Sequence, residues 1–223
     1  MNYKSIPFFL AYIFIVFLDL LFGYLGFQEF RMLTKPLIVI SLIIYFGYKG
    51  KQLPKKVFQY TTMALCFSLV GDIMLLYEDR SPIFFMLGLS AFLLAHISYS
   101  IVFISQRNLK FTKEYWIMVT ALVSFGVALF LMVMKNLGDF MIPVIIYIMV
   151  ILVMAITSSN RMGMVSRKSF VLVLIGALFF ILSDSILAIN KFNFPVPLSH
   201  FWIMSTYAIS QYLIVNGLLV SNE

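Results

Sequence analysis

Residues 169–190, SFVLVLIGALFFILSDSILAIN, form an apolar stretch long enough to cross a bilayer as a helix, and it contains one carboxylate, Asp184. A second apolar run carries GDIMLL (71–76), which shares a small–Asp–x–x–Leu pattern with SDSILA (183–188). A charge at mid-membrane costs about 3 kcal/mol on insertion scales, so such residues usually face a bundle interior or a hydrated cavity. The repeated pattern therefore indicates a functional site inside a membrane bundle. Asp19 interrupts another apolar run, without the pattern.

The composition is that of a membrane protein. Of 223 residues, 62% are hydrophobic and 11% charged, whereas soluble domains carry about 25% charged residues. Apolar runs of about 20 residues recur along the chain, and none alternates as a membrane β-barrel would. We therefore expect an all-α fold, a polytopic transmembrane helical bundle in which residues 1–223 form a single integral membrane domain.

Eight spans are predicted, and the second is short at 16 residues. Pro36, Pro82 and Pro143 are placed in first turns, where a missing N–H is harmless. The predicted spans are Ile6–Phe27, Leu33–Tyr48, Val57–Tyr77, Pro82–Ser105, Tyr115–Met134, Phe140–Thr157, Ser169–Asn190 and Leu198–Val220.

The net charge of +7 follows from basic residues in short loops, a distribution that sets membrane orientation and does not indicate nucleic-acid binding. Eleven Lys and Arg lie on the side of the N-terminus and five on the other. The positive-inside rule then places both termini in the cytoplasm, and we expect a bacterial cytoplasmic membrane. Lys4 and the apolar run after it are interpreted as a retained first span, because no clear cleavage site follows.

This topology places the two patterned acids at similar depths. The third and seventh spans run in the same direction, and each acid lies five or six residues before the end of its span, about 8–9 Å from the outer end. The two acids are 112 residues apart, as are Tyr99 and Gln211. The spacing suggests a 4+4 parallel repeat of helices.

If Asp72 and Asp184 face each other, repulsion and poor solvation would keep one protonated while the other is ionised. That arrangement suits a general acid and a general base in one pocket. The alternative is that each carboxyl group pins a neighbouring helix through hydrogen bonds. Both interpretations require the side chains to face the bundle interior.

Other polar residues are candidates for the same site. His96 and Tyr99 share a face of the fourth span, and Tyr207 and Gln211 share a face of the last. The alternative is that they only join helices through hydrogen bonds.

Lys35 could meet a phosphate at the outer interface or pair with an acid, or it could snorkel there without a ligand. Asn190, at a span end, could contact a headgroup or cap the helix. No metal site is expected, because the chain has one cysteine and no His-x-x-x-His spacing. Ser-x-x-Lys, Gly-x-Ser-x-Gly, P-loop and Rossmann patterns are also absent.

Five motifs occur in this order: TKPL (34–37), GDxxLL (71–76), AHxxY (95–99), SDxxLAxxxF (183–192) and QYLI (211–214). Together these motifs resemble the YhhN-like family, which includes the lysoplasmalogenases. The resemblance runs from about residue 35 to residue 217.

The resemblance implies a membrane hydrolase that cleaves the vinyl-ether bond of a lysoplasmalogen-type lysophospholipid, releasing a fatty aldehyde and a glycerophospho-base without a cofactor. Asp72 and Asp184 would be the acid–base pair, and Lys35 would attract the phosphate. The water or the glycerol oxygens would be oriented by His96, Tyr99, Tyr207 and Gln211. Asp19 inherits no role. The alternatives are a small-solute or proton-coupled transporter and a lipid-binding or structural bundle.

Overall fold

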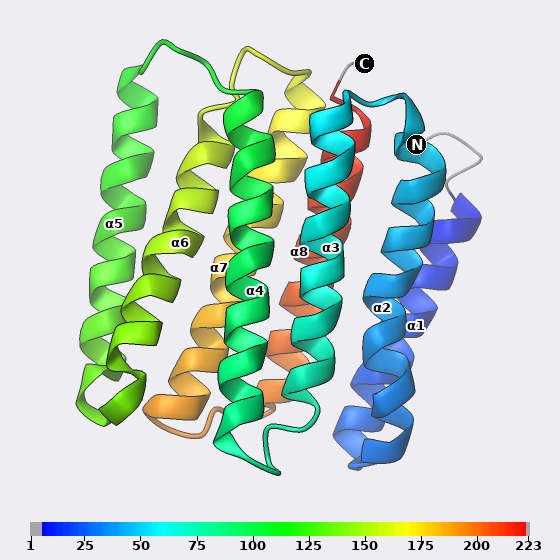
Figure 1. Ribbon diagram of the computed structural model, residues 1–223, viewed down its shortest axis with the longest axis vertical. Helices are drawn as coiled ribbons and strands as arrows, with labels where there is room; N and C mark the ends of the chain where they lie inside the picture. Colours follow the sequence, from blue (N-terminus) through cyan, green and yellow to red (C-terminus); the bar gives the residue numbers. More distant parts are fainter. Residues whose placement is uncertain (1–5, 222–223) are drawn as a thin grey trace.

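The computed structural model describes residues 6–221, which form a bundle of eight α-helices without a β-strand (Figure 1). The all-α prediction is confirmed. Lys4 lies outside the described residues. The helices are α1 (Ile6–Leu25), α2 (Gln28–Lys49), α3 (Lys55–Leu75), α4 (Pro82–Ser105), α5 (Lys113–Val133), α6 (Met141–Ser159), α7 (Arg167–Phe192) and α8 (Ser199–Leu219).

The second helix differs from its prediction. It has 22 residues and begins at Gln28, so Pro36 lies inside the helix and not in its first turn. The link from α1 is very short, with Gly26 at a φ of +75°. Polar residues such as Gln28 and Arg31 lower the hydropathy of the first turns of α2, which hid the helix start in the sequence. Pro82 does begin α4, directly after the N-cap Ser81.

Seven helices, α1 to α7, are long and apolar enough to cross a membrane. The eighth has 21 residues but a more polar composition, because it carries Tyr207, Ser210 and Gln211. These side chains are buried between helices, so the polarity of α8 faces the bundle interior. Its low hydropathy reflects that position.

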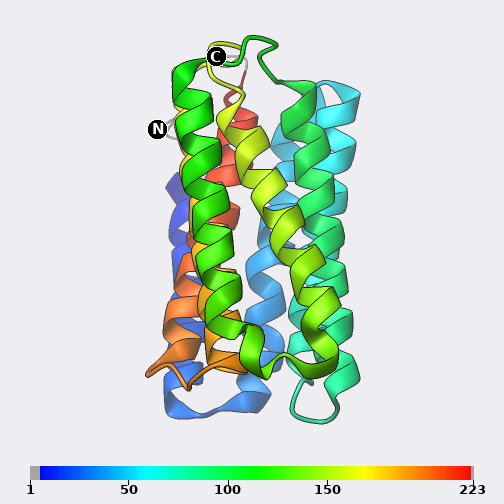
Figure 2. The same cartoon turned by 90° about the vertical axis from the view of Figure 1, so that its left-hand side faces the viewer.

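The helices form two similar halves. Helices α3, α4, α7 and α8 lie at the centre, while α1 with α2 and α5 with α6 form opposite edges (Figure 1). Within each half the third helix packs along the fourth, α3 on α4 and α7 on α8. The view from the side of α5 shows all helices roughly along one axis (Figure 2). This arrangement agrees with the predicted 4+4 parallel repeat.

Close helix packing depends on glycines at the α7–α8 contact. A Cβ on Gly176 would lie 3.0 Å from both Ser210 O and Ile214 N, and a Cβ on Gly217 would lie 3.0 Å from Val173 N. Small residues let helix backbones approach in this way in membrane proteins. The contact fixes α8, and with it Tyr207 and Gln211, against the centre of the bundle.

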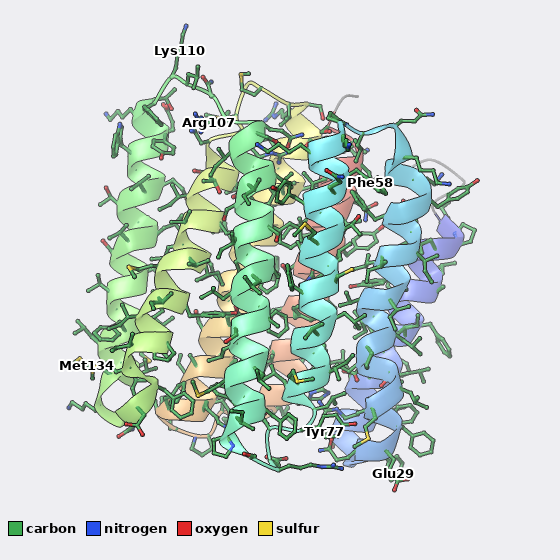
Figure 3. All side chains as sticks on the ribbon, viewed as in Figure 1. Glu29, Phe58, Tyr77, Arg107, Lys110 and Met134 are labelled. Carbon is green, nitrogen blue, oxygen red and sulfur yellow. The ribbon has the colours of Figure 1, made fainter. Side chains whose placement is uncertain are left out.

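The two ends of the bundle differ in charge. Arg107 and Lys110 lie at one end, and Glu29 and Tyr77 lie at the other (Figure 3). We call these the Arg107 end and the Glu29 end. At the Arg107 end, the buried Arg161 donates to Gln106 Oε1 and Ser169 Oγ. Burial lowers the pKa of its guanidinium to about 10, so it stays charged at neutral pH.

Candidate functional site

Asp72 is at the centre of a buried polar network that joins α2, α3 and α8. The Tyr207 hydroxyl donates to Asp72 Oδ2 at 2.8 Å, and Lys35 Nζ lies 3.9 Å from Asp72 Oδ1. The side chains of Lys35 and Asp72 are only 8% and 2% exposed. A buried carboxylate and ammonium compensate each other in this way. The Lys35 contact is longer than a hydrogen bond, so the ammonium keeps donors for another acceptor.

The same network continues to α4. Gln211 donates through Nε2 to Ser68 Oγ at 2.9 Å and to Tyr207 Oη at 3.3 Å, and it accepts from Tyr99 Oη at 2.7 Å. These side chains are all buried. The predicted residues Tyr99, Tyr207 and Gln211 are therefore brought together, and their bonds fix the orientation of the Tyr207 hydroxyl that meets Asp72.

A second network surrounds Asp184. Tyr147 of α6 donates to Asp184 Oδ2 at 2.6 Å, and His96 Nε2 lies 3.2 Å from the same oxygen and 3.0 Å from Tyr147 Oη. The Tyr147 hydroxyl proton is donated to Asp184, so it is not available to His96. His96 Nε2 therefore carries a proton and is the donor to these two oxygens. His96 Nδ1 is then an acceptor, and it is buried without a hydrogen-bond partner among residues 6–221.

The two carboxyl groups belong to separate networks and do not form one hydrogen-bonded pair. The Phe180 ring lies between the partners, with its centroid 4.6 Å from that of His96 and 5.5 Å from that of Tyr207. An apolar ring offers no path for a hydrogen bond. The expected sharing of one proton by Asp72 and Asp184 therefore has no direct hydrogen bond to support it.

The partners of the two acids follow the repeat. Asp72 meets Lys35 from the second helix of its own half and Tyr207 from the fourth helix of the other half. Asp184 likewise meets Tyr147 from α6 and His96 from α4. Lys35 and Tyr147 are 112 residues apart, the same interval as the two acids. Tyr147 was missing from the sequence-based candidates, and this interval is the signal that could have found it.

The small residue before each acid has a packing role. A Cβ on Gly71 would lie 2.6 Å from the Phe92 ring, so this ring packs directly on the α3 backbone. Ser183 instead donates to Ile203 O of α8 at 3.1 Å. Both residues bring a neighbouring helix close to the turn that carries the acid.

A polar pocket opens near Lys35 at the Glu29 end. It has a volume of about 160 Å³, which is room for several water molecules. Arg31 and Lys35 line it, together with Glu78, Asp79 and the predicted Asn190. Asn190 Oδ1 also accepts from Val196 N at 2.9 Å and so holds the α7–α8 link, whereas the C-cap residue of α7 is Asn193. The pocket presents cationic and anionic groups together.

An apolar cavity, which we call the inner cavity, reaches Asp184 from the other side. Asp184 and Tyr147 are among its few polar lining residues, and the rest are mostly apolar side chains of α4, α5, α6 and α7, such as Phe85 and Ile181. The Asp184 side chain is 13% exposed, whereas Asp72 lines neither this cavity nor the polar pocket. Leu187 lines both spaces, so a polar compartment and an apolar one adjoin at this residue.

Asp19 belongs to a third cluster near the polar pocket. Its Oδ1 accepts from Thr34 Oγ1 at 2.9 Å, and its Oδ2 lies 3.6 Å from His200 Nε2. His200 Nδ1 meets Arg31 Nη2 at 2.9 Å. The guanidinium can only donate, which assigns Nδ1 as the acceptor. His200 Nε2–H then donates to the backbone oxygen of Asp19 at 3.3 Å, so the main chain of α1 holds His200 against Arg31. In residues 6–221, no three side chains of His, Cys, Asp or Glu gather as a metal site would require.

Comparisons with known proteins confirm the resemblance. The model of the YhhN family matches residues 30–218. Lysoplasmalogenase TMEM86A of Homo sapiens is 35% identical over 164 residues, which are 72% of this chain and 65% of that protein. The Bos taurus protein of the same name is 30% identical over the same shares. The chain thus matches just under two thirds of each relative. No solved structure matches it significantly.

Proposed function

We propose that this chain, which belongs to the YhhN family, hydrolyses the vinyl-ether bond of a lysoplasmalogen-type lysophospholipid. The observation that carries the proposal is the junction at Leu187, where the polar pocket meets the inner cavity that contains Asp184. An amphipathic lipid with one hydrocarbon chain has the same division into a charged and an apolar part. The relatives named as lysoplasmalogenases agree with this substrate class.

The polar pocket suits a phosphate-containing headgroup. Lys35 has donors that Asp72 does not use at 3.9 Å, and Arg31 contributes a second cation. A guanidinium and an ammonium are the usual protein partners of phosphate. The apolar chain would then extend from Leu187 into the inner cavity, which places the bond between headgroup and chain close to Asp184.

The chemistry needs a proton donor and an activated water at that bond. Protonation of the vinyl carbon gives an oxocarbenium ion, water adds to it, and the resulting hemiacetal collapses to an aldehyde and the free glycerol hydroxyl. Asp184, held by Tyr147 and His96, is the carboxyl group that reaches the inner cavity. We assign it the acid–base role, comparable to that of carboxyl groups in glycosidases.

Asp72 then acts at a distance from the reacting bond. It balances the charge of Lys35 and receives the Tyr207 hydroxyl, so it positions the group that binds phosphate. In this proposal Tyr99 and Gln211 hold Tyr207, His96 serves Asp184, and Asn190 shapes the polar pocket.

The test is hydrolysis by the purified protein in detergent or nanodiscs. A lysoplasmalogen should release free aldehyde, whereas lysophospholipids with an ester or a saturated ether link should not, because neither forms the oxocarbenium ion by carbon protonation. Absence of aldehyde release under all conditions would overturn the proposal. Proton-coupled solute flux in proteoliposomes would then favour the transporter alternative, which the buried Lys35–Asp72 pair also suits.

A further inference from the structure

The inner cavity is too small for a long hydrocarbon chain. Its volume is about 40 Å³, and since about 10–15 Å³ is needed for one water molecule, it has room for only a few waters. A lysolipid chain of many methylene groups therefore needs further space. The part of the chain nearest Asp184 fits the cavity, and the remainder must continue elsewhere.

An apolar groove on the outer face of α5 and α6 offers that space. This outer groove has a volume of about 490 Å³ and is lined by apolar side chains such as Val127 and Met149. Both of these residues are 53% exposed on the surface that would face lipid. The outer groove shares three lining residues with the inner cavity, namely Gly126, Ile148 and Leu152.

These three residues form a thin wall between the two spaces. Gly126 has no side chain, and a Cβ at this position would lie 2.5 Å from Leu152 Cδ1. The flexible end of the Leu152 side chain therefore occupies the place that any other residue at 126 would fill. Rotation of this one leucine side chain would vacate the space beside Gly126, between the cavity and the groove.

We propose that the contact between Gly126 and Leu152 is a lateral opening for the hydrocarbon chain of the substrate. The inference rests on the proposed function and adds the route by which the chain reaches the site. The occupant is the hydrocarbon chain of the lysophospholipid, because the wall residues are apolar and the opening leads from the lipid-facing surface to the Asp184 carboxyl group. The aldehyde product leaves by the same opening into the bilayer.

The first test is chain-length selectivity. Gly126→Val places a side chain in the opening, so the kcat/KM for a long-chain lysoplasmalogen, divided by that for a short-chain water-soluble analogue, should fall about 10-fold or more. Ala128→Val adds bulk to an exposed position of the same helix that lines neither space. This control should leave the ratio unchanged. An unchanged ratio in Gly126→Val would overturn the opening but not the proposed hydrolysis.

The second test uses the unmodified protein and needs no turnover. A lysophospholipid with an uncleavable ether link and a photoactivatable diazirine is cross-linked at two chain positions. A diazirine near the headgroup should label inner-cavity residues such as Ile181, and one near the chain end should label outer-groove residues such as Met149, with excess unlabelled lipid competing for both. Labelling at the groove between α1 and α8, or no competed labelling, would overturn the opening. This result is independent of whether the protein hydrolyses any lipid.

Discussion

The Tyr147 hydroxyl lies 2.6 Å from Asp184 Oδ2, the shortest of the contacts made by the two patterned acids. It joins α6 to α7 at the one acid that lines the inner cavity. His96 meets both atoms of this contact from α4. Three helices thus hold a carboxyl group in a fixed position beside an apolar space, and the predictions on activity follow from this geometry.

Asp184→Asn should abolish aldehyde release while the protein still folds. The amide is similar in size but cannot exchange a proton, and general acid–base groups contribute about 100-fold or more to rate. Turnover of a lysoplasmalogen and the elution profile of the detergent-solubilised protein are the two measurements. Asp139→Asn, in the exposed link between α5 and α6, is the control. Full activity in Asp184→Asn would remove this carboxyl group from the mechanism.

Tyr147→Phe should lower kcat by about 10-fold or more and change KM less. The change removes the 2.6 Å bond that orients Asp184 and keeps the ring that lines the cavity. Tyr48→Phe is the matched control, because Tyr48 is 74% exposed and lies in the last turn of α2. A kcat equal to that of the original protein would show that Asp184 is positioned without Tyr147.

Breaking the Lys35–Asp72 pair should cost stability. Asp72→Asn or Lys35→Met leaves one buried charge without its partner, which should lower the free energy of unfolding by up to about 3 kcal/mol. The double variant should recover part of this loss, as a double-mutant cycle in thermal melting can detect. The exposed Lys191–Glu78 pair is the control and should contribute less than about 1 kcal/mol. Additive losses in the cycle would mean that the two charges do not interact.

Gly176→Ala should destabilise the bundle by about 1–3 kcal/mol, because the new methyl group meets backbone atoms of α8 and the helices must separate. Gly47→Ala is the opposite case. Nothing lies within 4 Å of a Cβ at that position, so helix propensity alone should stabilise it by about 0.5–1 kcal/mol. Melting temperatures of the two variants in one detergent compare them directly. A rise for Gly176→Ala would show that the α7–α8 contact is not tight.

The number and type of helices could be predicted because each span is long and apolar. The start of α4 could be predicted because Pro82 acts locally on the first turn of the helix. The start of α2 could not, because Gln28 and Arg31 are polar residues inside a helix that folds against its neighbours. Asp72 and Asp184 were found as candidates because a carboxylate in an apolar run costs free energy wherever the helix packs.

The sequence by itself determined a helical membrane bundle with two patterned acids in equivalent helices. Only the tertiary structure decided that Tyr147 bonds to Asp184 and that Phe180 lies between the two networks. It alone linked the backbone oxygen of Asp19 to Arg31 through His200. The physical reason is that hydropathy acts along a single segment, whereas side-chain pairing depends on the rotation and axial position of helices that are distant in the chain.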